Sequence, residues 1–123
     1  MKVLLVGEEG IVRRRIADAL AETPGVRVTL SSPAEDEVRS CVDRELPDVV
    51  IVNVHMPSGG ALEMIRELKS LDRPPVVIAL SSTRSFTYRT LCQQAGAEYY
   101  FDVVHEPEWL TQAVRELEEH LTC

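Results

Sequence analysis

Four polar side chains follow or interrupt apolar runs, at places where strand ends would bring them together. Glu8 and Glu9 follow the first apolar run, Asn53 lies within the third, and Ser81 follows the fourth. A pair of carboxylates can bind a hard cation through oxygen, or interact with the positive end of a following helix. A carboxamide within an apolar run costs about 1–3 kcal/mol unless it is hydrogen-bonded. We therefore expect Asn53 either to bond Glu8 or Ser81, or to cap the strand end as a satisfied amide.

Other chemical motifs are absent from the sequence or weak. It contains no Gly-x-Gly-x-x-Gly or Walker loop to hold phosphates and no Gly-x-Ser-x-Gly elbow. The three cysteines have wide, unpatterned spacing, which favours free thiols over a metal site. His55 stands alone in a loop, and we interpret it as neither a metal ligand nor a phosphohistidine. The run Arg13-Arg14-Arg15 is interpreted as a solvated helix face, with a docking patch for an acidic partner as the alternative.

Composition and charge narrow the class of protein. Lys and Arg number 13 against 20 Asp and Glu, which gives a net charge of −7. This balance opposes direct binding to nucleic acid or to anionic membranes. No signal peptide and no apolar run of about 18 residues is present. The chain of 123 residues is therefore expected to be one cytoplasmic domain, residues 1–123.

Apolar runs alternate with helical patterns along the whole chain. The expected strands cover 3–6, 26–30, 49–54, 76–80 and 99–104, and the expected helices cover 11–20, 33–46, 61–71, 86–95 and 107–121. Strict alternation predicts an α/β fold, with a parallel sheet covered by helices on both faces. The third and fourth runs are the most apolar and are expected at the centre, the second and fifth nearer the edges. Ser32 is expected to cap the second helix, with Pro33 at its first position.

The order and spacing of several short segments resemble those of a bacterial response-regulator receiver domain, over essentially the whole chain. The segments are Lys2-Val3-Leu4-Leu5-Val6 followed by acids, Pro47-Asp48, Met56-Pro57, Ala61-Leu62-Glu63, Val76 to Ser81, and Ala95-Gly96-Ala97-Glu98-Tyr99-Tyr100. The resemblance implies a flavodoxin-like, doubly wound (βα)5 fold with a five-stranded parallel sheet. It also implies signal transduction in a two-component system, in which a histidine kinase phosphorylates an aspartate.

The residues at the family's acidic positions depart from its pattern. The phosphoacceptor position, four residues before Pro57, is Asn53. The first of two Mg²⁺-binding acid positions is Gly7, and the second is Glu8, with Glu9 beside it. Moving the alignment by one residue makes Glu8 and Glu9 the pair instead. An acyl phosphate needs a carboxylate nucleophile, which a carboxamide does not replace. We therefore predict no cofactor, with weak residual Mg²⁺ binding left open.

The remaining positions of the family pattern give a mixed result. Ser81 occupies the Ser/Thr position, and Tyr100 occupies the aromatic switch position. The lysine that grips the phosphoryl group in the family is replaced by Val103, and the proline after it by Val104. A valine supplies no charge to offset that of a phosphoryl group. The sequence thus resembles a degenerate receiver, a pseudo-receiver.

These departures predict a non-enzymatic receiver module that acts by protein–protein interaction without phosphorylation. The resemblance implies that partners bind the face formed by helix 4, strand 5 and helix 5, here the exposed sides of 84–95, 99–102 and 107–121. The partner is expected to be a kinase, an output domain or a second copy of the chain. Two alternatives stay open: a phosphoacceptor regulator with an introduced Asp-to-Asn change, and a flavodoxin-like module that binds a small ligand.

Overall fold

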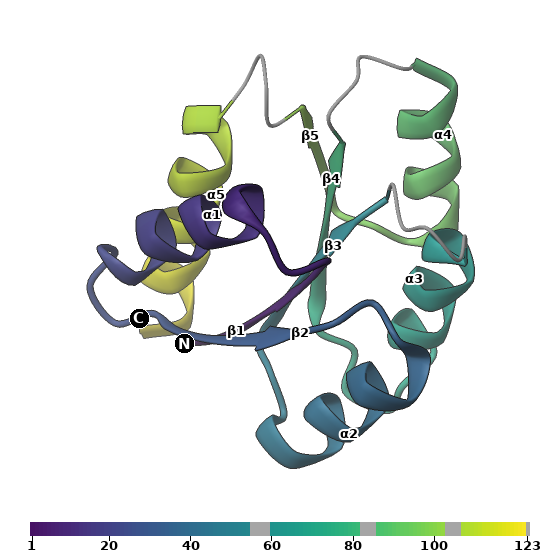
Figure 1. The fold of residues 1–123 in the computed structure, drawn as a ribbon, viewed down its shortest axis with the longest axis horizontal. Helices are drawn as coiled ribbons and strands as arrows, with labels where there is room; N and C mark the ends of the chain where they lie inside the picture. Colours follow the sequence, from purple (N-terminus) through teal and green to yellow (C-terminus); the bar gives the residue numbers. More distant parts are fainter. Residues whose placement is uncertain (55–59, 82–85, 103–106, 123) are drawn as a thin grey trace.

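The computed structural model describes residues 1–54, 60–81, 86–102 and 107–122, and its five parallel strands form one sheet in the order β2-β1-β3-β4-β5. The strands are β1 Lys2–Val6, β2 Arg27–Ser31, β3 Val49–Asn53, β4 Val76–Ser81 and β5 Tyr99–Asp102. The helices are α1 Ile11–Ala21, α2 Glu35–Glu45, α3 Ala61–Lys69, α4 Phe86–Ala95 and α5 Pro107–Thr122. Figure 1 shows α1 and α5 on one face of the sheet and α2, α3 and α4 on the other. Both β2 and β5 are edge strands, as the sequence predicts.

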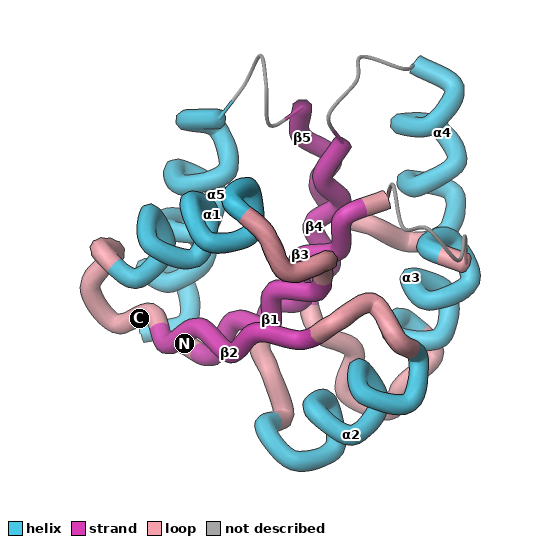
Figure 2. Tube along the Cα trace, viewed as in Figure 1, coloured by secondary structure: helices cyan, strands magenta, loops and turns pink. Residues whose placement is uncertain are grey.

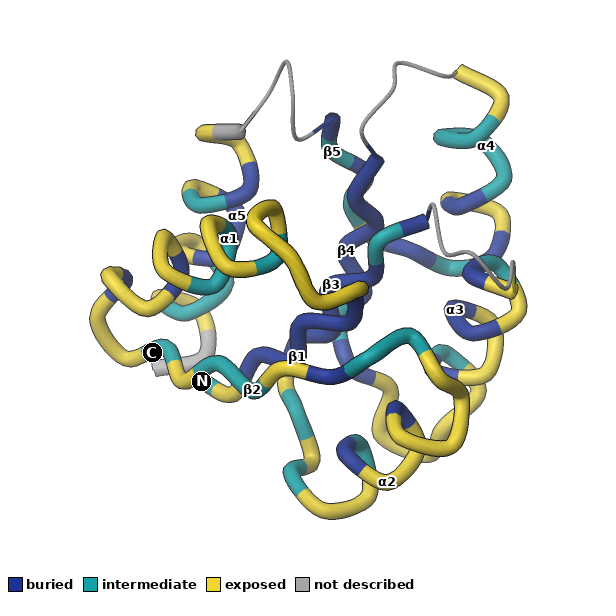
Figure 3. The backbone as a smooth tube through the Cα atoms, viewed as in Figure 1, coloured by how far each residue is buried: buried dark blue, intermediate teal, exposed yellow. Residues whose placement is uncertain are grey.

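The sheet separates two apolar cores. Alternate residues of a strand point to opposite faces, so Leu4 and Val6 of β1 join the core under α2, α3 and α4. Val3 and Leu5 join the core under α1 and α5. Because helices cover both faces of β1, β3 and β4, almost every residue of these strands is buried (Figure 3). No helix in the described part of the chain is both long and apolar enough to cross a membrane.

The first turns of α1 and α5 are more exposed than their apolar sequences suggest. Ile11 is 70% exposed and Val12 is 55% exposed, although both fit the apolar stripe of the first helix. Trp109 in α5 is likewise 55% exposed. The helix interior behaves as expected, since Leu20 and Val114 are fully covered. Periodicity identified the buried face of each helix but not how far its first turn extends beyond the core.

The start of α2 differs from the predicted cap at Ser32. The helix begins at Glu35, and the residue at its N-cap is Ala34, which has no side chain able to accept a capping hydrogen bond. Ser32 instead uses its hydroxyl to donate to the carboxylate of Glu37, and its backbone N–H also points to that carboxylate at 3.4 Å. Ser32 therefore does not cap the helix backbone. It lies before the helix and bonds the side chain of Glu37, a residue of the first turn.

A half-buried ion pair joins α3 to the segments that lead into β4 and β5. The Lys69 ammonium lies 2.7 Å from the Glu98 carboxylate and donates to the Pro75 carbonyl at 2.8 Å. The second carboxylate oxygen of Glu98 accepts from the Val77 N–H at 3.2 Å. Gly96 lies against this pair with a φ of +115°, a conformation that favours glycine. A Cβ at this position would lie 2.8 Å from Cγ of Lys69, so the pair requires glycine here.

We expect Gly96→Ala to lower the free energy of unfolding by about 1–3 kcal/mol, because it adds backbone strain and displaces Lys69. Gly10→Ala is the matched control. Gly10 has an extended φ of 163°, and no atom lies within 4 Å of a Cβ placed there. Urea unfolding should therefore show a clearly larger loss for the first variant than for the second, which replaces the N-cap glycine of α1. Equal losses would contradict this account.

Candidate functional site

The carboxyl ends of the strands meet along one edge of the sheet, where α/β folds of this kind bind ligands (Figure 2). Val6 of β1 pairs with Val52 of β3, which places Gly7 beside Asn53 at the next position. A Cβ at Gly7 would lie 3.7 Å from that of Asn53, an ordinary van der Waals contact. Gly7 is therefore the β1-end residue beside Asn53, as the first of the two alignments predicts.

An arginine of α1 lies next to this pair. The Arg13 guanidinium donates to the Gly7 carbonyl at 3.2 Å, and the Gly7 N–H donates to the Ser31 carbonyl at 3.1 Å. The two hydrogen bonds fix the backbone at the end of β1. The hydrogen bonds from Ser32 lower the pKa of the Glu37 carboxyl, and the charge of Arg13 adds to this effect. The Arg13 guanidinium is thus held by the backbone at the end of β1, where its charge also acts on Glu37.

Ser81 ends β4 at a position that no solvent reaches. It is 1% exposed and pairs with Asp102 of β5, which is also 1% exposed. Asn53 pairs with Leu80, the residue before Ser81, and the Val54 N–H donates to the Leu80 carbonyl at 2.9 Å. The sheet therefore brings Gly7, Asn53 and Ser81 to one edge, and it adds a buried carboxylate.

Tyr100 points into the core rather than into solvent. Its side chain is 5% exposed and belongs to the core under α2, α3 and α4. The guanidinium carbon of Arg89 in α4 lies 5.3 Å from the centre of its ring, within the range of a cation–π interaction. The hydroxyl of Tyr100 is buried, and it has no hydrogen-bond partner among the residues that the structure describes. Arg89 thus covers the ring of Tyr100 from α4. The hydroxyl adds no hydrogen bond to the described residues.

The two acidic residues after β1 are exposed, unlike Ser81 and Asp102. Glu8 and Glu9 lie in the loop between β1 and α1. Within residues 1–54, 60–81, 86–102 and 107–120, no group of three His, Cys, Asp or Glu side chains could hold a metal ion. The predicted lysine-equivalent position Val103, together with Val104, His55 and Pro57, lies outside the described residues.

Three polar groups of the site were not selected from the sequence as site residues: Arg13, Arg89 and Asp102. Asp102 is the one charged residue of the apolar run 99–104, and alternation places it on the same face as Tyr100. That pattern could have identified it. Arg89 appeared only as part of a surface, since helical spacing gave no sign that it covers a ring of β5. Arg13 was assigned to a solvated face, but it is half-buried against the end of β1.

The comparison with protein families identifies the chain. The model of the response regulator receiver domain matches residues 3–115, and the chain belongs to this family. The response regulator GacA of Pseudomonas aeruginosa is 29% identical over 117 residues, which cover 95% of this chain and 55% of that protein. The positive alginate biosynthesis regulatory protein of the same species is 28% identical over 116 residues, 94% of this chain and 46% of that protein. The chain thus spans about half the length of these relatives.

Solved structures agree with the fold. A two-component response regulator of the LuxR family from Aurantimonas has a TM-score of 0.84 at 22% identity, covering 97% of this chain and 85% of that one. The response regulator domain of Thermotoga maritima CheB has a TM-score of 0.78 at 17% identity, covering 98% and 94%. The predicted flavodoxin-like (βα)5 fold is therefore confirmed. Receiver domains of this family are regulatory, and they interact with kinases and output domains.

The geometry of Gly7 and Asn53 leads to a prediction about Mg²⁺. The double variant Gly7→Asp, Asn53→Asp is expected to bind Mg²⁺ at least about tenfold more tightly than the wild type, because two adjacent carboxylates attract a dication strongly. A Cβ at Gly7 makes only an ordinary van der Waals contact with Asn53. The control, Gln93→Glu with Gln94→Glu, adds the same charge on the exposed side of α4. Calorimetry should show tighter binding for the first variant only, and equal binding by the control would contradict the assignment.

Proposed function

We propose that this chain is a receiver module that signals through protein–protein contacts and does not accept a phosphoryl group. The observation that carries the proposal is the pairing of Asn53 with Gly7 at the end of β3. In the family, this edge of the sheet holds the phosphorylated aspartate and an acid beside it. In this chain Asn53 has a carboxamide at the first of these positions, and Gly7 has no side chain at the second.

The chemistry of the site supports this proposal. A carboxamide has no anionic oxygen to attack phosphorus, so Asn53 does not form an acyl phosphate. Mg²⁺ prefers a site with one or two carboxylates, and Glu8 is the acid left at the family's positions. The uncharged Val103 at the lysine position removes the family's usual partner for phosphoryl oxygens.

The placement of Tyr100 supports a domain held in one conformation. In the family, the aromatic residue of strand 5 shifts as the domain switches. In this chain the ring is already buried, with the Arg89 guanidinium over it. A cation–π contact of this kind stabilises by about 0.5–2 kcal/mol. We propose that this contact keeps α4 against β5 without a phosphoryl signal.

The surface proposed for partner binding is formed by α4, β5 and α5. Phe86, at the start of α4, is 83% exposed, and Trp109, at the start of α5, is 55% exposed. Exposed aromatic rings are common at the centres of protein interfaces. We propose a cytoplasmic module that binds a kinase, an output domain or a second copy through this surface, and that catalyses no reaction itself.

The proposal is tested by an amide-resolved NMR titration, first with Mg²⁺ and then with beryllofluoride, a mimic of the phosphoryl group. We expect the signals of Glu8, Asn53 and Ser81 to stay unchanged, because the site lacks the carboxylate that beryllofluoride needs. Saturable shifts that extend to Tyr100 would contradict the proposal. The variant Asn53→Asp tests the alternative that this chain is a phosphoacceptor regulator with an introduced Asp-to-Asn change. If that single substitution allowed labelling by a small phosphodonor, Asn53 alone would account for the loss of phosphorylation.

The role of Arg89 leads to a further prediction. Arg89→Ala should lower the free energy of unfolding by about 0.5–2 kcal/mol, because it removes the cation over the ring. It should also shift the aromatic signals of Tyr100 and speed hydrogen exchange along α4. Arg66→Ala, which removes an exposed arginine of α3, is the control and should change these quantities little. Similar effects of the two variants would show that the ring contact does not hold α4.

A further inference from the structure

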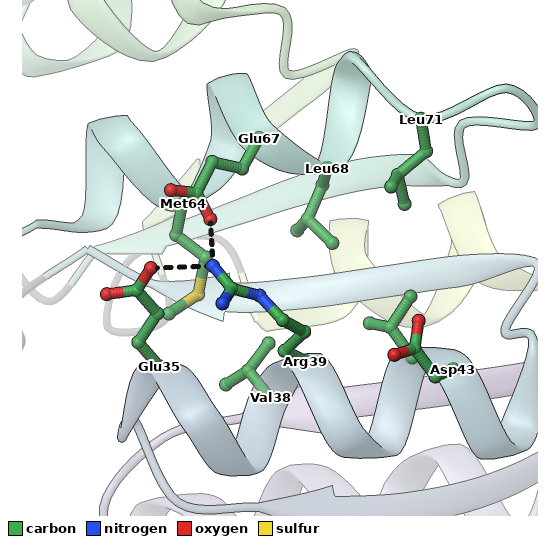
Figure 4. A pocket seen from close by; sticks show the side chains of 9 residues that line it. Glu35, Val38, Arg39, Asp43, Met64, Glu67, Leu68 and Leu71 are labelled. Carbon is green, nitrogen blue, oxygen red and sulfur yellow. Dashed lines mark hydrogen bonds and ion pairs between the residues drawn. The ribbon is translucent and has the colours of Figure 1, made fainter.

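A shallow hollow lies between α2 and α3, away from the carboxyl edge of the sheet (Figure 4). Its apolar floor consists of Val38 and Val42 from α2, Met64 and Leu68 from α3, and Leu71 just after α3. Val38, Met64 and Leu68 are core residues, whereas Leu71 is 42% exposed. Because Val38, Met64 and Leu68 are only 3%, 8% and 5% exposed, the apolar surface open to solvent here comes mainly from Leu71 and the partly buried Val42. We call this feature the α2–α3 groove.

The rim of the groove is charged and mostly acidic. Arg39 crosses it, with its guanidinium 2.9 Å from the Glu35 carboxylate of α2 and 3.5 Å from the Glu67 carboxylate of α3 (Figure 4). Asp43 adds a third carboxylate. The side chains of Arg39, Glu35 and Glu67 are 60%, 62% and 56% exposed, respectively. Ion pairs this exposed contribute at most about 1 kcal/mol, so a competing cation can displace Arg39.

The apolar surface continues beyond α2 and α3. A second depression, at the amino-terminal edge of the sheet, shares Val42, Asp43 and Leu71 with the α2–α3 groove. It is also lined by Leu46, which is 73% exposed. Together the two depressions form one apolar surface, long enough to contact more than a single side chain. Its acidic rim continues into the second depression, which is lined by Asp48, Asp72 and Arg73.

We propose that the α2–α3 groove binds an amphipathic helix of a partner protein, with aliphatic side chains on the apolar floor and Arg or Lys residues on both flanks. Helices bind apolar grooves through side chains spaced three or four residues apart. Basic flanks match the acidic rim and compete with Arg39 for Glu35 and Glu67. The rim and the net charge of −7 disfavour nucleic acid, anionic lipid and a second copy of the chain as occupants.

The α2–α3 groove itself contains no residue of α4, β5 or α5, although the second depression is also lined by Leu117 and His120 of α5. The floor and rim of the groove come from α2, α3 and Leu71, and none of these residues belongs to the edge that contains Asn53. The proposal therefore does not rest on whether the chain accepts a phosphoryl group. Binding at the groove can fail while the proposed function holds, and the reverse is equally true.

Two synthetic helical peptides test the proposal. Both have leucines at positions i, i+4 and i+7, flanked in one peptide by arginines and in the other by glutamates. Amide-resolved NMR of the whole chain should show saturable shifts with the arginine peptide, confined to residues 35–46 and 64–73. Raising the salt from about 50 mM to about 300 mM should weaken this binding several-fold, because the rim charges are exposed. No shifts, or equal binding of the two peptides, would overturn the proposal.

Exposed variants add a second measurement. Glu67→Arg reverses a charge of the rim and should weaken binding of the arginine peptide at least about tenfold. Leu71→Lys, at an exposed floor position, should have a similar effect. Glu116→Arg makes the same charge change on exposed α5, on the other face of the sheet, and should leave binding unchanged. Equal losses in the control, or groove shifts that depend on protein concentration and indicate a second copy as occupant, would overturn the proposal.

Discussion

The pairing of β3 with β1 and β4 is the constraint on which the rest of the molecule depends. Side chains alternate between two buried faces, so a shift of one residue would turn every apolar side chain of β3 to the wrong core. The register is therefore fixed by the cores, and it in turn fixes the edge of the sheet. Val6 lies opposite Val52, and Asn53 lies opposite Leu80. The positions of Gly7, Asn53 and Ser81 at this edge thus follow from the packing of the strands below them.

This separation explains how a receiver can keep its geometry while its chemistry changes. Replacing a carboxylate at the edge removes mutual repulsion between acids and leaves the cores intact. At the Gly7 position the structure has room for a side chain beside Asn53, yet the sequence has none there. Polar groups remain deeply buried on neighbouring strands, at Ser81 and Asp102. The register that the two cores impose places these two groups at the same edge as Gly7 and Asn53.

The sequence predicted the fold well, because strand and helix periodicity reflects burial directly. It also predicted that the loops after the strands meet at one edge, since parallel strands all end there. It did not predict that Arg89 covers the ring of Tyr100, because this contact depends on how α4 lies across β5, which no local pattern encodes. The start of α2 was also misplaced. Ser32 was expected to cap the helix, but its hydroxyl bonds the Glu37 side chain instead.

The ion pair of Lys69 and Glu98 links the two surfaces that we propose for binding. Lys69 ends α3, one wall of the α2–α3 groove, while Glu98 precedes β5 and its ring contact with Arg89. With side chains 23% and 34% exposed, the pair is better shielded from water than the rim of the groove. The Lys69–Glu98 pair is therefore less easily displaced than the ion pairs that Arg39 makes at the rim. Because this pair fixes the end of α3 to the sheet, α3 loses little conformational entropy when a partner binds the groove.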